Sequence, residues 1–187
     1  MSVDVVRRRF TVDEYVHMVE AGILTERDRV ELLDGEIVEM TPIGLPHAGS
    51  VAALVRVLVT RVGSRALVWP QGPIRVSERS LPEPDVTLLR PRPVSYSEAN
   101  AVPGDVLLLI EVSDTSLRRD RELKLPLYAE AGIIEYWIVD VQDKMIEVHT
   151  SPSGSRYGSV RRFGRGESVL PLAFPDLRIA VDEVFGP

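Results

Sequence analysis

The chain has 187 residues, of which 44% are hydrophobic, and no cysteine; this predicts one globular domain over residues 1–187 and excludes disulfides and thiolate metal sites. The formal net charge of −6 excludes a surface that is basic all over, so any nucleic acid would have to bind local basic patches. We expect a cytoplasmic protein with no membrane partner, because no apolar run approaches the length of a membrane span and the first residues lack the apolar core of a secretory signal.

The first predicted elements are a helix and a hairpin. A helix is expected over Thr11–Ala21, because Thr11 and Glu14 form a capping box and Gly22 follows as a terminating glycine. Two alternating apolar runs then flank Asp34-Gly35, a dipeptide typical of tight hairpins. Most glutamates of this hairpin should face solvent.

A second, strongly apolar helix is expected over Ala48–Val62, packed on a sheet. His47 ends the loop before it and is the one histidine that we keep as a candidate site residue, since the three histidines show no metal-ligand spacing.

Ala66–Trp69 and Ile74–Val76 are predicted strands around a Pro-Gln-Gly-Pro break, and the Pro-rich Arg90–Gly104 is a predicted exposed loop.

Two short apolar runs, Val86–Leu89 and Val106–Ile110, predict neighbouring central strands. Asp85 begins the first and Glu111 ends the second, so antiparallel pairing would direct both carboxylates at one spot. Two carboxylates a few Å apart repel each other unless a cation lies between them, and Mg²⁺ is a cation that binds carboxylate oxygens. Taken singly, each acid has a plainer reading, as a strand start after a proline or as the partner of an arginine at the sheet edge.

The segment Leu117–Ala131 predicts a helix in which Pro126 produces a kink or a second start. One face of this helix carries Asp120, Lys124 and Tyr128 at spacings of four residues. An Asp–Lys pair on the surface is the plain reading of that face.

Arginine supplies almost all of the basic charge, because Lys124 and Lys144 are the only lysines. A buried lysine can lose its proton, whereas an arginine cannot, so Lys124 just after the two acids suggests a chemical role. Lys144 fits a hairpin turn. The arginine bias, the single asparagine, the two glutamines and the many prolines would suit a thermophile or a GC-rich genome.

The remaining elements complete an α/β fold, a mixed β-sheet flanked by α-helices. Glu135–Asp140 and Met145–His149 predict a hairpin, Arg156–Phe163 a further strand, and Ala180–Phe185 a short helical turn.

Several segments form a specific combination. They are Glu31–Met40, Pro84-Asp85, Glu111-Val112-Ser113, Arg119–Lys124, Tyr128–Gly132 and Glu135–Asp140. Together they resemble a restriction-endonuclease family that is expanded in cyanobacteria and belongs to the PD-(D/E)XK nuclease superfamily. The resemblance extends over most of the chain and implies a restriction-endonuclease-like core with a metal ion at the split end of the sheet.

By this resemblance, Asp85 and Glu111 would bind Mg²⁺ or Mn²⁺. Ser113 stands where the motif has its lysine, and the resemblance implies that Lys124 on the following helix takes that role. Glu31 would be a further acid of the site. The implied function is a Mg²⁺-dependent endonuclease that hydrolyses DNA phosphodiester bonds as a homodimer.

Two other functions stay open. A non-catalytic nuclease-fold module that binds nucleic acid or regulates would explain Ser113 and the negative net charge. A metal-dependent hydrolase of small phosphoesters would lack a basic groove wide enough for a duplex. The position of the Lys124 nitrogen relative to the Asp85–Glu111 pair discriminates between catalysis and the non-catalytic module.

Overall fold

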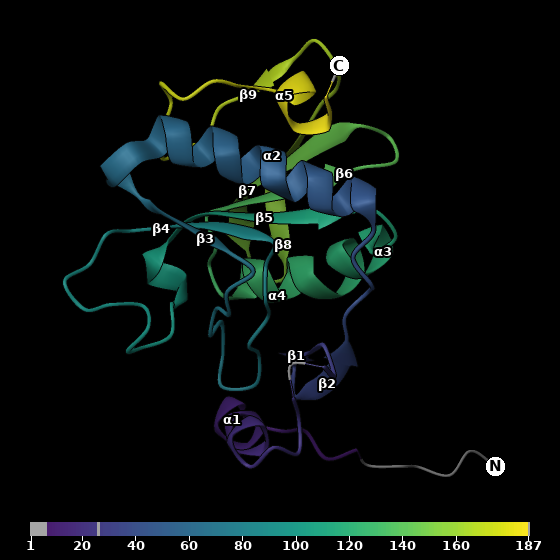
Figure 1. Cartoon of the computed structure of the whole chain (residues 1–187), viewed down its shortest axis with the longest axis vertical. Coiled ribbons are helices and arrows are strands. Elements are labelled where there is room, and N and C mark those ends of the chain that lie inside the picture. Colours follow the sequence, from purple (N-terminus) through teal and green to yellow (C-terminus); the bar gives the residue numbers. More distant parts are fainter. Residues whose placement is uncertain (1–6, 26, 187) are drawn as a thin grey trace.

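A six-stranded mixed sheet, in the order β3-β4-β5-β6-β7-β8, forms the centre of the computed structural model, which describes residues 7–25 and 27–186 (Figure 1). Only β5 and β6 pair in parallel; the other neighbours are antiparallel. The predicted mixed sheet flanked by helices is therefore confirmed. Its strands are β3 (Leu67–Pro70), β4 (Val86–Leu89), β5 (Val106–Ser113), β6 (Glu135–Asp140), β7 (Met145–Ser153) and β8 (Arg156–Phe163).

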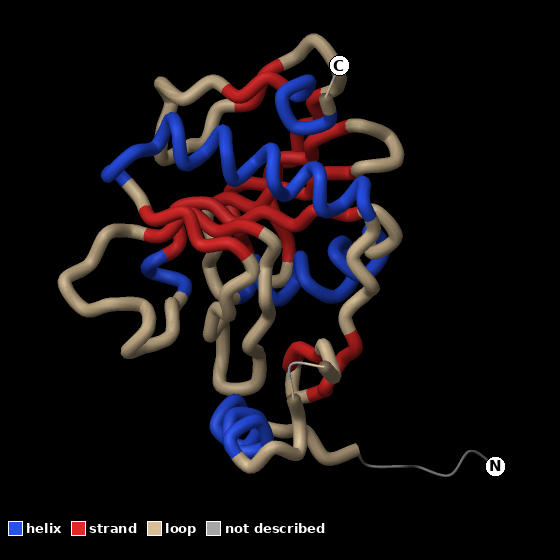
Figure 2. Tube along the Cα trace, in the orientation of Figure 1, coloured by secondary structure: helices blue, strands red, loops and turns tan. Residues whose placement is uncertain are grey.

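Helices cover the two faces of this sheet (Figure 2). Helix α2 (Leu45–Val62) lies along one face, and α4 (Leu125–Glu130) lies against the other. Side chains alternate along a strand, so Leu108 and Ile110 of β5 join the core beside α2, whereas Leu109 joins the core beside α4. This alternation also directs the next odd-numbered residue, Glu111, toward the α4 side.

The N-terminal elements lie at one end of the molecule, away from the main sheet (Figure 1). The predicted capping box is present, because Thr11 accepts a hydrogen bond from the Glu14 backbone and begins α1 (Val12–Glu20). The hairpin of β1 (Val30–Leu33) and β2 (Glu36–Glu39) turns at Asp34-Gly35 as predicted, with positive φ at both residues.

The C-terminal segment packs on the α2 side of the sheet. The helical turn predicted there is α5, and the short pair β9–β10 was not predicted, because two-residue strands leave no periodic pattern. The remaining elements are η1 (Gly63–Arg65), η2 (Pro103–Asp105), β9 (Ser168–Val169), β10 (Ile179–Ala180) and α5 (Val181–Phe185).

The predicted start of the second helix and one predicted strand are wrong. Helix α2 begins at Leu45 rather than Ala48, because Pro46 occupies an early helical position where its missing N–H costs nothing. His47 is therefore in the first turn of the helix and not in a loop. Residues Ile74–Val76 do not form a strand: Ile74 alone makes an isolated bridge, with Ala101, and the Val76 N–H turns back to the Ser80 carbonyl.

The predicted helix Leu117–Ala131 consists of three segments, α3 (Leu117–Arg119), the π-helical η3 (Asp120–Lys124) and α4. Pro126 explains the irregularity, because it has no N–H and its ring crowds the preceding turn. The helix widens just before it, and the Leu125 N–H donates to the Asp120 carbonyl, five residues back. Such π-helical turns are frequent at functional sites.

One expectation about membranes needs correction. Residues Leu45–Arg65, α2 with the turn after it, are long and apolar enough to cross a membrane by length and composition alone. A core helix meets the same criterion, and Leu54, Leu58 and Val62 of α2 are buried against the sheet. The finding is thus weak evidence for a membrane.

Candidate active site

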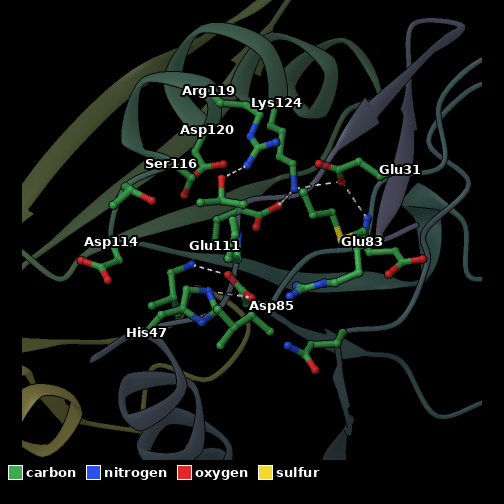
Figure 3. A pocket seen from close by; sticks show the side chains of 18 of the residues that line it. Glu31, His47, Glu83, Asp85, Glu111, Asp114, Ser116, Arg119, Asp120 and Lys124 are labelled. Carbon is green, nitrogen blue, oxygen red and sulfur yellow. Dashed lines mark hydrogen bonds and ion pairs between the residues drawn. The ribbon is translucent and has the colours of Figure 1, made fainter. Parts of the chain in front are cut away.

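Asp85 and Glu111 lie close together on two central strands (Figure 3). Asp85 directly precedes β4, whereas Glu111 lies inside β5, because β5 continues to Ser113 instead of ending at Ile110 as predicted. Val86 of β4 pairs with Ile110 of β5. Asp85, just before Val86, and Glu111, just after Ile110, therefore lie opposite each other. The Val112 N–H donates to Asp85 Oδ2 at 2.8 Å and holds that carboxylate in place. Both acids line a cleft of about 440 Å³. The two apolar runs are neighbouring central strands, as predicted, and they pair antiparallel.

The Glu111 carboxylate receives two donors from the helix that follows β5. Lys124 Nζ lies 3.0 Å from Glu111 Oε1, and the Tyr128 hydroxyl donates to the same oxygen at 2.7 Å. All three side chains are buried. The sequence indicated that Lys124 and Tyr128 share a helix face, but it did not assign Tyr128 to the site; the four-residue spacing was the available signal.

Glu31 of the N-terminal hairpin completes the cluster. Its Oε2 lies 3.0 Å from Lys124 Nζ and accepts a hydrogen bond from the Glu83 backbone N–H at 3.2 Å. Glu31 is 1% exposed, unlike the other glutamates of the hairpin, Glu36 and Glu39. Lys124 therefore bridges two carboxylates that come from distant parts of the chain, and the four predicted site residues meet at one cleft. Their roles in catalysis stay a prediction.

Burial and charge set the protonation of this cluster. Burial raises the pKa of Glu111 well above its ordinary value; the Lys124 charge opposes this rise, and the charges of Asp120 and Asp85 add to it. Burial alone would lower the pKa of Lys124, but the negative charges of Glu111 and Glu31 raise it above its ordinary value. Lys124 is thus a cation at neutral pH, which favours charge stabilisation over proton abstraction.

Ser113 stands at the position of the motif lysine and has a structural role. Its hydroxyl donates to Asp120 Oδ2 at 2.7 Å, and the Ser116 hydroxyl donates to the same oxygen at 2.6 Å. These bonds tie the end of β5 to the helix that carries Lys124. Asp120 and Lys124 are both buried, so the reading of this face as a surface ion pair is wrong.

His47 also reaches the site, from the first turn of α2. Its Nε2 lies 3.1 Å from Asp85 Oδ1. This hydrogen bond raises the pKa of His47, while partial burial opposes the rise. His47 Nδ1 is buried and has no hydrogen-bond partner among the described residues.

The carboxylate oxygens of Asp85 and Glu111 are of the kind that a hard divalent cation prefers. The pair has no third ligand: across residues 7–25 and 27–186, no group of three or more histidine, aspartate or glutamate side chains is arranged to hold a metal ion. Two carboxylates suffice for Mg²⁺, which keeps several of its waters. Asp85 and Glu111 offer such oxygens at one wall of the cleft, and they are the residues that would hold the ion.

Two arginines line the same cleft, Arg29 and Arg119. The Arg119 guanidinium donates to the Glu39 carbonyl at 2.6 Å and to the Thr41 hydroxyl, which fixes it at the cleft wall. These are the charges that a phosphate backbone would meet there.

Comparisons with known proteins agree with this fold. A family model, Uma2, described as "Putative restriction endonuclease", matches residues 12–182. A crystal structure described as a "putative nuclease belonging to DUF820" from Anabaena variabilis superposes with a TM-score of 0.70 at 15% identity, over 94% of this chain and 97% of that one. At this identity the superposition establishes the fold alone. A search among curated proteins found no match.

The family match covers most of the chain, and the fold that it implies is the one observed. The predicted restriction-endonuclease-like core is confirmed. The chain belongs to the Uma2 family of restriction-endonuclease-like proteins.

Proposed function

We propose that this protein is a Mg²⁺-dependent endonuclease that hydrolyses DNA phosphodiester bonds. The observation that carries the proposal is the meeting of Asp85 and Glu111 across β4 and β5, with the Lys124 ammonium 3.0 Å from Glu111. A nuclease needs two carboxylates for the cation and a positive charge beside the phosphate, and the cleft contains both. Membership of the Uma2 family supports a nucleic-acid substrate.

The bound ion would polarise the phosphate and lower the pKa of its water. Asp85 and Glu111 would hold it. Lys124 would place its positive charge where negative charge develops on the phosphate, and Glu31 would keep the ammonium at that point through its 3.0 Å contact. Arg29 and Arg119 at the cleft wall would bind neighbouring phosphates of the backbone.

The proximity of Lys124 bears on the non-catalytic alternative. A lysine facing away from the two acids would have favoured a binding or regulatory module, whereas its nitrogen contacts Glu111 directly. Ser113 no longer favours that module either, because its hydroxyl anchors the helix of Lys124 through Asp120.

Cleavage of plasmid DNA tests the proposal. Wild-type protein should nick or linearise the plasmid with Mg²⁺ or Mn²⁺ and not with EDTA, and Asp85→Asn should not. A small diester, bis-p-nitrophenyl phosphate, distinguishes the substrate classes: hydrolysis of the small diester without DNA cleavage would favour the small-phosphoester hydrolase. Metal-independent DNA binding with no cleavage across several metals would favour the non-catalytic module.

We further propose a homodimer in the cytoplasm, because cutting both strands of a duplex usually needs two sites. Light scattering after size-exclusion chromatography would measure twice the mass of one 20.8 kDa chain. A monomer at micromolar concentration, with or without DNA, would contradict the dimer.

A further inference from the structure

The hydroxyl of Tyr128 differs in its hydrogen-bond partner from the hydroxyls of the other buried tyrosines of the described chain, Tyr15, Tyr136 and Tyr157. The sequence has five tyrosines, and all lie in the described part of the chain. Four of them donate to backbone carbonyls: Tyr15 to Val30, Tyr96 to Arg90, Tyr136 to Asp120 and Tyr157 to Ile133. Tyr128 instead donates to the carboxylate of Glu111 at 2.7 Å. A backbone carbonyl would satisfy a buried hydroxyl equally well, so this partner needs its own explanation.

Tyr128 and Lys124 both donate to one oxygen of Glu111. Lys124 Nζ and the Tyr128 hydroxyl reach Oε1 from successive turns of the same helix. None of the described residues donates a hydrogen bond to Oε2, and Glu111 lines the cleft (Figure 3). Two donors on Oε1 therefore leave Oε2 available to a ligand in the cleft.

The tyrosine ring is held firmly enough to orient a carboxylate. Tyr128 is fully buried, and its ring packs edge-on against Tyr136 with centroids 5.0 Å apart. Tyr136 in turn packs against His149 at 5.7 Å. A ring fixed in this way fixes its hydroxyl, whereas the longer lysine chain alone could follow either oxygen of a rotating carboxylate.

We propose that Tyr128 is a positioning residue that locks the Glu111 carboxylate so that Oε2 faces the metal ion. The inference rests on the proposed function and deepens it. Tyr128 is buried behind Glu111 and does not line the cleft, so it acts on the ion only through that carboxylate. Groups that orient a metal ligand typically affect metal affinity or activity by about 10–100-fold when removed.

Tyr128→Phe tests this, with Tyr157→Phe as the matched control that also removes one buried hydroxyl. We expect Tyr128→Phe to weaken Mn²⁺ binding in calorimetry and to lower kcat for plasmid cleavage, each by about 10–100-fold, with KM for DNA unchanged. Tyr157→Phe should match wild type in all three measurements. A structural effect of hydroxyl loss would move both variants together, and that result would overturn the positioning role.

The outcomes separate this inference from the proposed function. If wild type binds Mn²⁺ and cleaves DNA while Tyr128→Phe equals it, the positioning role alone is overturned. If wild type neither binds Mn²⁺ nor cleaves, both are overturned. A crystal structure of wild type with Mn²⁺ provides a test that needs no variant: the ion on Oε2 with the Tyr128 bond intact supports the proposal, and the ion on Oε1 with that bond broken overturns it.

Discussion

Lys124 Nζ lies 3.0 Å from Glu111 Oε1, although 13 positions separate the two residues in sequence. The motif lysine would stand two residues after the glutamate, on the same strand, where this chain has Ser113. A widened helical turn, anchored to the strand end by Asp120, carries Lys124 to the carboxylate. The positive charge of the site is therefore supplied by the helix instead of the strand.

Lys124→Arg should abolish most of the cleavage. Lys124 is 5% exposed and lies between Glu111 and Glu31, so a bulkier, planar guanidinium cannot occupy the same place. Loss of a positioned charge at a reacting phosphate typically lowers kcat by about 10²–10³-fold. Plasmid cleavage with Mg²⁺ measures the effect. Lys144→Arg, at an exposed turn, is the matched control and should keep full activity. Equal cleavage by Lys124→Arg and wild type would contradict a role for the lysine.

Asp85→Asn should weaken Mn²⁺ binding by more than about 10–100-fold, the range for groups that merely support a ligand. A neutral amide offers one weaker oxygen to a hard cation. Calorimetric titration of Mn²⁺ measures the change. Asp114→Asn is the control, because Asp114 lines the cleft but its side chain hydrogen-bonds Gln142. Unchanged affinity in Asp85→Asn, or an equal loss in both variants, would argue against a metal on the Asp85–Glu111 pair.

Two glycine substitutions should have opposite effects on stability. A Cβ on Gly72 would lie 1.6 Å from Trp69 Nε1, so Gly72→Ala forces the indole or the backbone to move. Such overpacking typically costs about 1–3 kcal/mol. A Cβ on Gly49, inside α2, would meet nothing within 4 Å, and Gly49→Ala should stabilise the helix by about 0.5–1 kcal/mol. Urea unfolding of both variants measures the changes in the free energy of unfolding. A Gly72→Ala midpoint at or above that of wild type would refute the predicted loss of stability.

Glu147 should make the stability of the fold fall at acidic pH. Its hydrogen bond with His149, and those that it accepts from Arg121 and Arg162, hold the pKa of Glu147 well below its ordinary value against the opposing effect of burial. A depressed pKa contributes stability that is fully present above the unfolded-state pKa, about 4.3, and is lost as the pH falls below it toward the folded-state pKa.

Glu147→Gln should therefore destabilise the protein at pH 7 and pH 5 by a similar amount, about 1.5–3 kcal/mol, the range for hydrogen bonds to charged groups. The difference in unfolding free energy between Glu147→Gln and wild type should become smaller at pH 3. Chemical unfolding at the three pH values provides the measurement, with the exposed Glu130→Gln as the control that stays near wild type throughout. If the stability difference between Glu147→Gln and wild type increased as the pH falls, the predicted contribution of the Glu147 carboxylate would be contradicted.

Local sequence patterns determined most of the elements of this protein. Residues close together in the chain specify the cap of α1, the Asp34-Gly35 turn and the apolar runs of β4 and β5. These elements could therefore be predicted from the sequence alone. The adjacency of Asp85 and Glu111 followed from the same runs, although β5 continues past Glu111 to Ser113. The lysine was suggested by its rarity among arginines and by the family resemblance.

Only the tertiary structure decided how the site is assembled. The burial of Glu31 depends on how the N-terminal hairpin packs against the segment before β4, through the Leu32–Leu81 bridge and the Glu83 N–H. The contact of His47 with Asp85 depends on where α2 begins. The pairing of Tyr128 with Glu111 depends on the π-helical turn before Pro126 and on which face of β5 meets that helix. These are contacts between elements far apart in the chain, and no local pattern encodes their distances, because packing of the whole core fixes them.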